Sequence, residues 1–325
     1  MTSPFDGYEV RESQRPSDKA FAFDLDRALS SVVALEAEIP EDAFTAETLG
    51  TERIGNGVVI GENGLVLTIG YLLTEAEEVT LTTNDGRRIP AHVLGYDQAT
   101  GFGLVHALEP LGLPALALGD SRRVGAEEPV LLAGAGGRAH TVAARIVARE
   151  PFAGYWEYLL DEALFTAPAH PHWSGAALIG PDGRLIGVGS LQLEQEGAGG
   201  KTTPLNMCVP AELLPPLLDD LAKGLPPRAP RPWLGMFAQE VEEKVVVLGA
   251  AKGGPAARAE LRRGDVVLAV DGAPVEGLAD FYRRLWALGP PGVTVPLTLW
   301  RGGDVFDVAI RSVDRAALLR KPRFN

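Results

Sequence analysis

The feature that most constrains this chain is a run of short apolar segments separated by turn residues, which extends over residues 55–188. Asn63-Gly64 and Asp85-Gly86 lie between such segments. These dipeptides are strong signals for two-residue hairpin turns, because both turn positions accept a positive φ. Many short strands at this spacing predict a sandwich or barrels, and about 190 residues suffice for two small barrels packed together. The sequence therefore predicts a mainly β fold.

A proline-rich segment divides the chain. Residues 224–232 read G-L-P-P-R-A-P-R-P, a composition that favours an extended spacer. Predicted strands and one helix at residues 278–288 follow, which indicates a second, α+β unit. In chain order we predict a flexible arm (1–20), a barrel domain (21–223) that ends in a helix, the linker (224–232), an α+β domain (233–313) and a basic tail that frays (314–325).

The charge balance excludes some classes of partner. Lys and Arg number 30 against 43 Asp and Glu, so the net charge is −13, which repels nucleic acids and anionic membranes. The sequence shows no run of about 18 apolar residues and no cationic leader followed by an apolar stretch. We expect no nucleic-acid partner, no membrane insertion and a cytoplasmic location. Cys208, the one cysteine, requires no oxidising compartment, and its apolar neighbours predict a buried thiol.

The histidines show no pattern typical of a metal site. His92 and His106 lie in predicted strands, with no Cys or second carboxylate at metal-ligand spacing. We therefore expect neither a metal ion nor a cofactor.

The best candidate for chemistry is Ser174. Residues 169–188 read A-H-P-H-W-S-G-A-A-L-I-G-P-D-G-R-L-I-G-V, so Ser174 sits in a tight Ser-Gly turn before an apolar hairpin. A strand hairpin can present a nucleophile in this way. A serine needs a base, a carboxylate that orients the base, and an oxyanion hole before it can cleave a peptide bond.

Three segments give the chain a resemblance to a known family. They are G-N-G-V-V-I-G-E-N-G-L-V-L-T-I-G-Y-L-L from Gly55, Y-D-Q-A-T-G-F-G-L-V around Gly101, and H-W-S-G-A-A-L-I around Ser174. Together they resemble the HtrA-like serine proteases, which carry a chymotrypsin-type double β-barrel followed by a PDZ domain. The resemblance covers roughly residues 25–313. It places Tyr71 where the family has its general-base histidine and Gly101 where it has its orienting carboxylate.

These replacements predict an impaired site. A phenol with a pKa near 10 is protonated at neutral pH, so Tyr71 is a poor base, and Gly101 offers no acceptor. The resemblance also puts His172 at the glycine whose amide helps to form the oxyanion hole, which indicates a reshaped or blocked hole.

Two alternatives would preserve some chemistry. His170, His172 or His140 would supply a base from a new direction, and Asp97 would serve as a displaced carboxylate. Asp before a strand is ordinarily a turn residue, and a residue two positions before the serine usually points elsewhere.

The second domain carries a better-kept site. The run R-P-W-L-G-M-F around Trp233 resembles the carboxylate-binding loop of PDZ domains. The resemblance implies that the amides of Leu234, Gly235 and Met236 hold the C-terminal carboxylate of a peptide, which adds as a strand beside this segment. The alternative, a groove occluded by the chain's own barrel, stays open.

From the sequence we predict a catalytically impaired HtrA-like protein that binds peptides or protein C-termini through its PDZ domain. One alternative is an active endopeptidase that uses Ser174 with a non-standard base, and another is a regulatory subunit of an active paralogue. Family members usually associate as trimers through an N-terminal segment. The resemblance therefore implies a homo- or hetero-oligomer, with Phe21 and Phe23 at the corresponding place.

Overall fold

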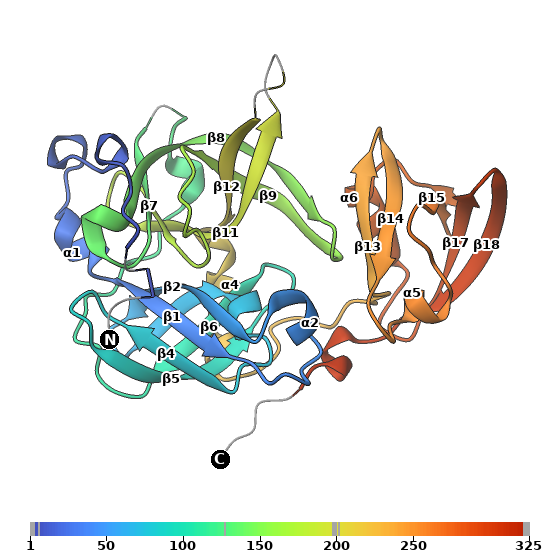
Figure 1. The fold of residues 1–325 in the computed structure, drawn as a ribbon, viewed down its shortest axis with the longest axis horizontal. Coiled ribbons are helices and arrows are strands. Elements are labelled where there is room, and N and C mark those ends of the chain that lie inside the picture. Colours follow the sequence, from blue (N-terminus) through green and yellow to red (C-terminus); the bar gives the residue numbers. More distant parts are fainter. Residues whose placement is uncertain (1–3, 6, 127, 197–199, 201, 321–325) are drawn as a thin grey trace. The chain divides into compact units, whose positions relative to one another are not determined.

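The computed structural model describes residues 4–5, 7–126, 128–196, 200 and 202–320 (Figure 1). In this part of the chain the strands form two closed six-stranded barrels and one open sheet. The predicted fold class, a double β-barrel followed by an α+β domain, is confirmed.

The first barrel is closed by strands in the order β1-β2-β3-β6-β5-β4. The hairpins between β2 and β3 and between β4 and β5 occur where the two dipeptides predict them, with φ of 90° at Gly64 and 85° at Gly86. Asn63 and Asp85 do not take a positive φ, so the turns are not of the predicted two-residue type. Alternate side chains such as Leu35, Val66 and Leu81 fill the interior. The strands are β1 (Val32–Glu38), β2 (Glu52–Gly61), β3 (Leu65–Ile69), β4 (Glu78–Thr82), β5 (Arg88–Tyr96) and β6 (Phe102–Ala107).

The second barrel follows the order β10-β11-β12-β9-β8-β7. Its core contains Leu132, Leu178 and Cys208, all fully buried. The prediction of a buried thiol is confirmed for Cys208, and burial raises the pKa of this thiol to about 12. The strands are β7 (Val130–Ala133), β8 (Thr141–Gly154), β9 (Tyr158–Ala167), β10 (Ala177–Ile179), β11 (Leu185–Glu196) and β12 (Thr202–Pro210).

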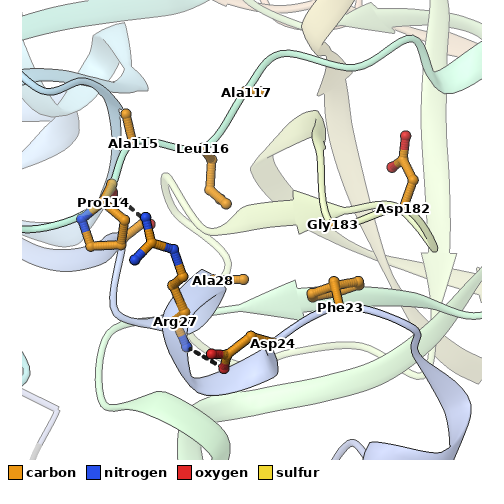
Figure 2. Close-up of a pocket in the computed structure, with 11 residues that line it drawn as sticks. Phe23, Asp24, Arg27, Ala28, Pro114, Ala115, Leu116, Ala117, Asp182 and Gly183 are labelled. Atoms are coloured by element: carbon orange, nitrogen blue, oxygen red, sulfur yellow. Dashed lines mark hydrogen bonds between the residues drawn. The ribbon is translucent and has the colours of Figure 1, made fainter.

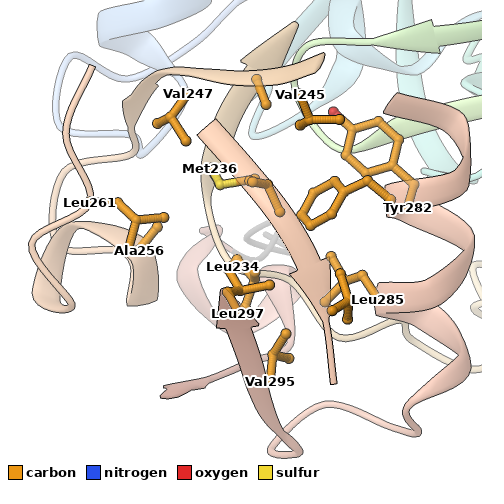
Figure 3. Close-up of a cluster of buried hydrophobic side chains, with 14 of the residues drawn as sticks. Leu234, Met236, Val245, Val247, Ala256, Leu261, Tyr282, Leu285, Val295 and Leu297 are labelled. Carbon is orange, nitrogen blue, oxygen red and sulfur yellow. The ribbon is translucent and has the colours of Figure 1, made fainter. Parts of the chain in front are cut away.

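The open sheet runs β13-β14-β15-β17-β18, and β16 pairs with β15. Helix α6 (Leu278–Ala287) buries Leu278, Phe281 and Leu285 in the hydrophobic cluster of this unit, and Leu285 is labelled in Figure 3. Leu234 and Met236 join the same cluster (Figure 3). The strands are β13 (Met236–Val241), β14 (Lys244–Ala250), β15 (Val266–Val270), β16 (Ala273–Pro274), β17 (Thr294–Arg301) and β18 (Asp304–Arg311).

The remaining helices are short. None among the described residues is long and apolar enough to cross a membrane. The α-helices are α1 (Leu25–Leu29), α2 (Ala46–Leu49), α3 (Gly70–Leu73), α4 (Pro215–Ala222) and α5 (Pro255–Arg258). The 3-10 helices are Glu12–Gln14, Asp18–Ala20, Ser121–Arg123, Gly137–His140, Ala211–Leu213 and Arg315–Leu318.

The described part of the predicted N-terminal arm contains buried residues, in contrast to the flexible segment that composition predicts. Val10 is 1% exposed within the core of the second barrel, and its amide donates to the carbonyl of Ala139 at 2.8 Å. Phe5 is buried as well. A few buried apolar side chains suffice to anchor the arm to the barrel. The average composition of the arm does not show them, because most of its residues are polar. Residues 1–3 and 6 of the predicted arm lie outside the described residues.

The chain divides into two compact units whose bounds differ from the predicted domains. The first comprises Met1–Glu150, Glu162–Pro227 and Arg320–Asn325, and the second comprises Pro151–Asp161 and Arg228–Leu319. The segment Pro151–Asp161, which we assigned to the barrel domain, therefore belongs with the C-terminal unit.

The basic tail also departs from its prediction. The amide of Arg320 donates to the carboxylate of Glu75 at 2.8 Å, so the predicted fraying does not extend to this residue. Residues 321–325 lie outside the described residues.

Candidate functional site

Ser174 lies in a tight turn between β9 and β10. Gly175 follows it with a φ of 73°, and its amide donates to the carbonyl of Gly189 at 2.9 Å. A Cβ at this position would lie 1.9 Å from the carbonyl oxygen of Asn56, so the turn admits only glycine.

Asn56, in β2, holds this turn in place. Its Nδ2 donates to the carbonyls of His172 and Ser174 at 2.9 and 3.0 Å, and its Oδ1 accepts the amide of Ala135 at 2.9 Å. The side chain is fully buried, so each of these hydrogen bonds satisfies a group that water cannot reach. Sequence reasoning missed this residue; the signal was an asparagine inside an otherwise apolar strand.

Tyr71, in α3, is the hydrogen-bond partner of the serine. Its hydroxyl lies 2.7 Å from Ser174 Oγ and donates to the carbonyl of Ser190 at 2.8 Å. The single phenol proton is directed to that carbonyl, so the Ser174 hydroxyl donates to the phenol oxygen. Burial raises the pKa of Tyr71 to about 12, against the hydrogen bonds with Ser174 and Trp173 that lower it. At neutral pH this phenol is neutral.

Gly101 stands in a main-chain turn and contributes no side chain. It has a φ of 85°, and its carbonyl accepts the amide of Gly70 at 2.7 Å. The carboxylate of Asp97 accepts the amide and the hydroxyl of Thr100 at 2.9 and 2.8 Å, within the same turn. Asp97 thus has the turn role expected of an Asp before a strand.

The amide of His172, which stands where the resemblance places an oxyanion-hole donor, is already hydrogen-bonded within the chain. It donates to Nδ1 of His170 at 2.9 Å, while His170 Nε2 lies 2.8 Å from the carbonyl of His140. The imidazole of His170 therefore carries its proton on Nε2 and accepts at Nδ1. Burial lowers the pKa of His170 to about 4, so this ring stays neutral at physiological pH.

The ring of His172 packs against the N-terminal arm. Its centroid lies 4.6 Å from that of Phe5 and 5.0 Å from that of Tyr8. Burial lowers its pKa as well. The Ser174 hydroxyl thus bonds a phenol rather than an imidazole, and both ring nitrogens of His170 serve the main chain.

The second candidate site is the loop before β13. The amide of Leu234 lies 3.1 and 3.2 Å from the two carboxylate oxygens of Glu157, and the amide of Met236 donates to one of them at 2.9 Å. Gly235 takes a φ of 70° between them, and the Trp233 ring lies against it. The loop predicted to bind a carboxylate thus surrounds one, and this carboxylate belongs to the chain itself.

A surface hollow of about 210 Å³ lies beside α1 (Figure 2). Its polar lining includes Asp24, Arg27 and Asp182. Asp24 caps α1 by accepting the amide of Arg27 at 3.0 Å, a structural role. We assign no chemistry to this hollow.

Among the residues that the structure describes, no group of three or more His, Cys, Asp and Glu side chains is placed to hold a metal ion.

Two protein families match the chain. One, described as a trypsin-like peptidase domain, matches residues 55–188, and the other, described as a PDZ domain, matches residues 232–311. The two matches cover the serine turn and the carboxylate loop respectively.

Curated relatives include a probable periplasmic serine endoprotease DegP-like from Pseudomonas fulva, 28% identical over 291 residues, or 83% of this chain and 58% of the relative. The periplasmic pH-dependent serine endoprotease DegQ of Escherichia coli is 26% identical over 88% of this chain and 68% of its own length. The chain spans a little over half the length of the first DegP-like relatives.

Solved structures share the fold. The HtrA-type protease AlgW with decapeptide has a TM-score of 0.53 at 20% identity, covering 92% of this chain and 98% of its own. The serine endoprotease from Yersinia pestis has a TM-score of 0.51 at 23% identity, covering 89% and 95%.

These relatives correct one expectation. The sequence led us to expect a cytoplasmic location, whereas the curated relatives are periplasmic proteins. The expectation was wrong because a missing pattern at the start of a sequence is weak ground for a location.

Proposed function

Since this chain belongs to the HtrA-like proteins, with a trypsin-like peptidase domain followed by a PDZ domain, we propose that it is a pseudoprotease that binds protein C-termini. Its barrels act as a scaffold, and its PDZ domain supplies the binding. By the same kinship we place it in the periplasm. The observation that carries the proposal is the hydrogen bond between Ser174 and Tyr71.

The first support concerns the base. A general base must accept the serine proton as the hydroxyl attacks. The phenol oxygen of Tyr71 accepts a hydrogen bond from Ser174, but taking up a second proton would require a strongly acidic oxonium. Ionising the phenol first is also unfavourable at neutral pH, since its pKa is raised to about 12. Tyr71 therefore positions the hydroxyl without activating it.

The second support concerns the transition state. Oxyanion stabilisation needs amides that point at the developing charge, and losing one donor costs about 100- to 1,000-fold in rate. The amide of His172 instead donates to the imidazole of His170. Gly101 offers no carboxylate that would hold a base in place. The loss thus extends to the base, its orienting group and one oxyanion donor.

The third support comes from the carboxylate loop. Amides of Leu234 and Met236 converge on a carboxylate at hydrogen-bond distance, the arrangement by which backbone nests bind C-termini. The HtrA-type relative AlgW was solved with a decapeptide. We infer that C-terminal peptides are the ligand class of this chain too.

The alternatives have separate consequences. An active endopeptidase would use Ser174, and a regulatory subunit would form mixed oligomers with an active paralogue. We propose a homo- or hetero-oligomer, with a trimer as the form that the family resemblance implies. Phe23 is its candidate contact, because Phe21 is already buried and lies 5.5 Å from the Phe23 ring.

Digestion of unfolded casein tests the proposed loss of catalysis. We expect the wild-type chain and Ser174→Ala to leave casein equally intact over many hours, as followed by release of fluorescent fragments. Cleavage by the wild-type chain that disappears in Ser174→Ala would establish the endopeptidase alternative instead.

A further inference from the structure

An unusual acidic residue, Glu157, lies at the turn between β8 and β9. It is 6% exposed, although glutamate is rarely buried without a partner. Its φ is 60°, a left-handed conformation that a non-glycine residue adopts at a cost. Burial raises the pKa of its carboxyl group to about 7, against the amides that lower it. The buried carboxyl group and the left-handed backbone of Glu157 are both energetically unfavourable in isolation.

The partners of Glu157 are those of a ligand. Its carboxylate receives the amides of Leu234 and Met236, from the loop that resembles the PDZ carboxylate-binding loop. The positive charge of Arg315 also acts on this carboxyl group and lowers its pKa. The Glu157 carboxylate therefore fills the main-chain nest, which recognises a carboxylate through its amide donors.

Neighbouring residues reproduce other parts of peptide binding. The carbonyl of Tyr155 accepts the amide of Ala238 in β13 at 2.9 Å, a main-chain bond of the kind that an added strand makes. Leu159 is buried in the hydrophobic cluster of the C-terminal unit (Figure 3 shows part of this cluster). The segment thus supplies a carboxylate, a strand-like carbonyl and an apolar side chain.

Tyr282, on α6, holds the turn from the other side. Its hydroxyl donates to the carbonyl of Gly154 at 2.8 Å and accepts the amide of Glu157 at 3.2 Å. Both ends of the turn are therefore bonded to the C-terminal unit, which explains why the segment belongs with that unit.

We propose that residues 154–159 are a built-in ligand of the PDZ domain, in which Glu157 imitates a C-terminal carboxylate, and that an external C-terminus must displace this segment to bind. The proposal rests on the proposed peptide-binding function and adds its regulation. It differs from the alternative left open by the sequence, a groove occluded by the barrel, because the segment that fills the site has the chemistry of a ligand and a competitor of the same chemistry can replace it.

The ionisation of Glu157 gives the competition a pH dependence. The charged and titratable groups that face it are Tyr282 on α6 and Arg315 beyond β18, since the residues of the loop and of the start of β13 carry no charge. The docked carboxyl has a pKa of about 7, whereas a released glutamate returns to its ordinary value near 4.3. Docking therefore takes up a proton between these values, so it strengthens as the pH falls below 7 and weakens as the pH rises toward 7.

Fluorescence anisotropy tests the competition with a labelled peptide. The peptide ends in Gly-Tyr-Trp-Leu, which repeats residues 154–156 and places a leucine with a free carboxylate after them. We expect Glu157→Gly to tighten binding about tenfold or more relative to the full-length wild-type chain, a typical size for such coupling. The ratio of the two dissociation constants should be larger at pH 5.5 than at pH 8.5. The ratio isolates the pH dependence that Glu157 causes, because protonation of the peptide changes its affinity for both proteins equally.

Glu243→Gly is the matched control. Glu243 is an exposed glutamate with a φ of 62° in the same unit, so this variant repeats the residue type and backbone conformation without touching the loop. We expect it to bind the peptide like the wild-type chain. The same peptide with an amidated C-terminus should bind the wild-type chain, Glu157→Gly and Glu243→Gly much more weakly than the peptide with a free carboxylate.

Hydrogen exchange of the Leu234 and Met236 amides separates this inference from the proposed function. Fast exchange in Glu157→Gly and slow exchange in the wild-type chain support the built-in ligand, even if no peptide binds, in which case the proposed peptide-binding function fails alone. Equal exchange in both proteins, or equal peptide affinity of folded Glu157→Gly and wild type, would overturn the inference.

Discussion

Restoring three altered positions together, with Tyr71→His, Gly101→Asp and His172→Gly, is expected to increase the rate at which a fluorophosphonate labels Ser174 by about 100-fold or more. A general base that is held in position contributes about 100- to 10,000-fold. The serine hydroxyl already donates to the side chain at position 71, so an imidazole there would be directed toward the same proton. Asp is among the residues that tolerate the positive φ of Gly101, which is 85°.

The single variants provide the control for this experiment. Triad members act as a unit, so Tyr71→His or Gly101→Asp alone should recover only a small part of the gain. The triple variant with Ser174→Ala should not be labelled. If the folded triple variant reacts no faster than the wild-type chain, the three positions are not what silences the serine.

Gly175→Ala is expected to destabilise the barrel unit by about 3 kcal/mol or more, as measured by chemical denaturation. Its Cβ would lie 1.9 Å from the Asn56 carbonyl oxygen and 2.6 Å from Thr68 Oγ1, and the backbone has a φ of 73°. The backbone of β2 would have to move, which would disturb the bonds between Asn56 and the serine turn.

Gly112→Ala is the matched control for this loss. Gly112 has a φ of 65°, and a Cβ there would meet nothing within 4 Å. The strain of the left-handed conformation alone costs about 1 kcal/mol. A similar loss of stability in both variants would show that the close approach to Asn56 is unimportant.

The fold was predictable because its signals are local. Gly64 and Gly86 reverse the chain where hairpin dipeptides occur. Tyr71 was found from sequence because it stands in a recognisable segment. That a tyrosine is a poor base also follows from its chemistry alone.

The interactions that decide the two sites were not predictable, because each joins a side chain to a distant main-chain group. Asn56 bonds the carbonyl of Ser174, 118 residues along the chain, and Glu157 bonds the amide of Met236, 79 residues away. Neither leaves a periodic pattern. Glu157 stands in the aromatic segment F-A-G-Y-W-E-Y, and only the tertiary fold shows that this acid is buried.

His170 illustrates the same limit within a short segment. The sequence offers it as a substitute base, because histidine is the commonest general base. In the structure its two ring nitrogens instead bond the main chain: Nδ1 accepts the amide of His172, and Nε2 donates to the carbonyl of His140. Burial then keeps it neutral, with a pKa of about 4. A residue suited to catalysis thus removes a donor on which catalysis would depend.

Intact-protein mass spectrometry after prolonged incubation with a fluorophosphonate tests the central claim most directly. We expect the wild-type chain to show no adduct on Ser174 and to match Ser174→Ala throughout, because a serine that donates to a neutral phenol has no base. A stoichiometric adduct on the wild-type chain that is absent from Ser174→Ala would show that Ser174 is an activated nucleophile, and it would contradict the account.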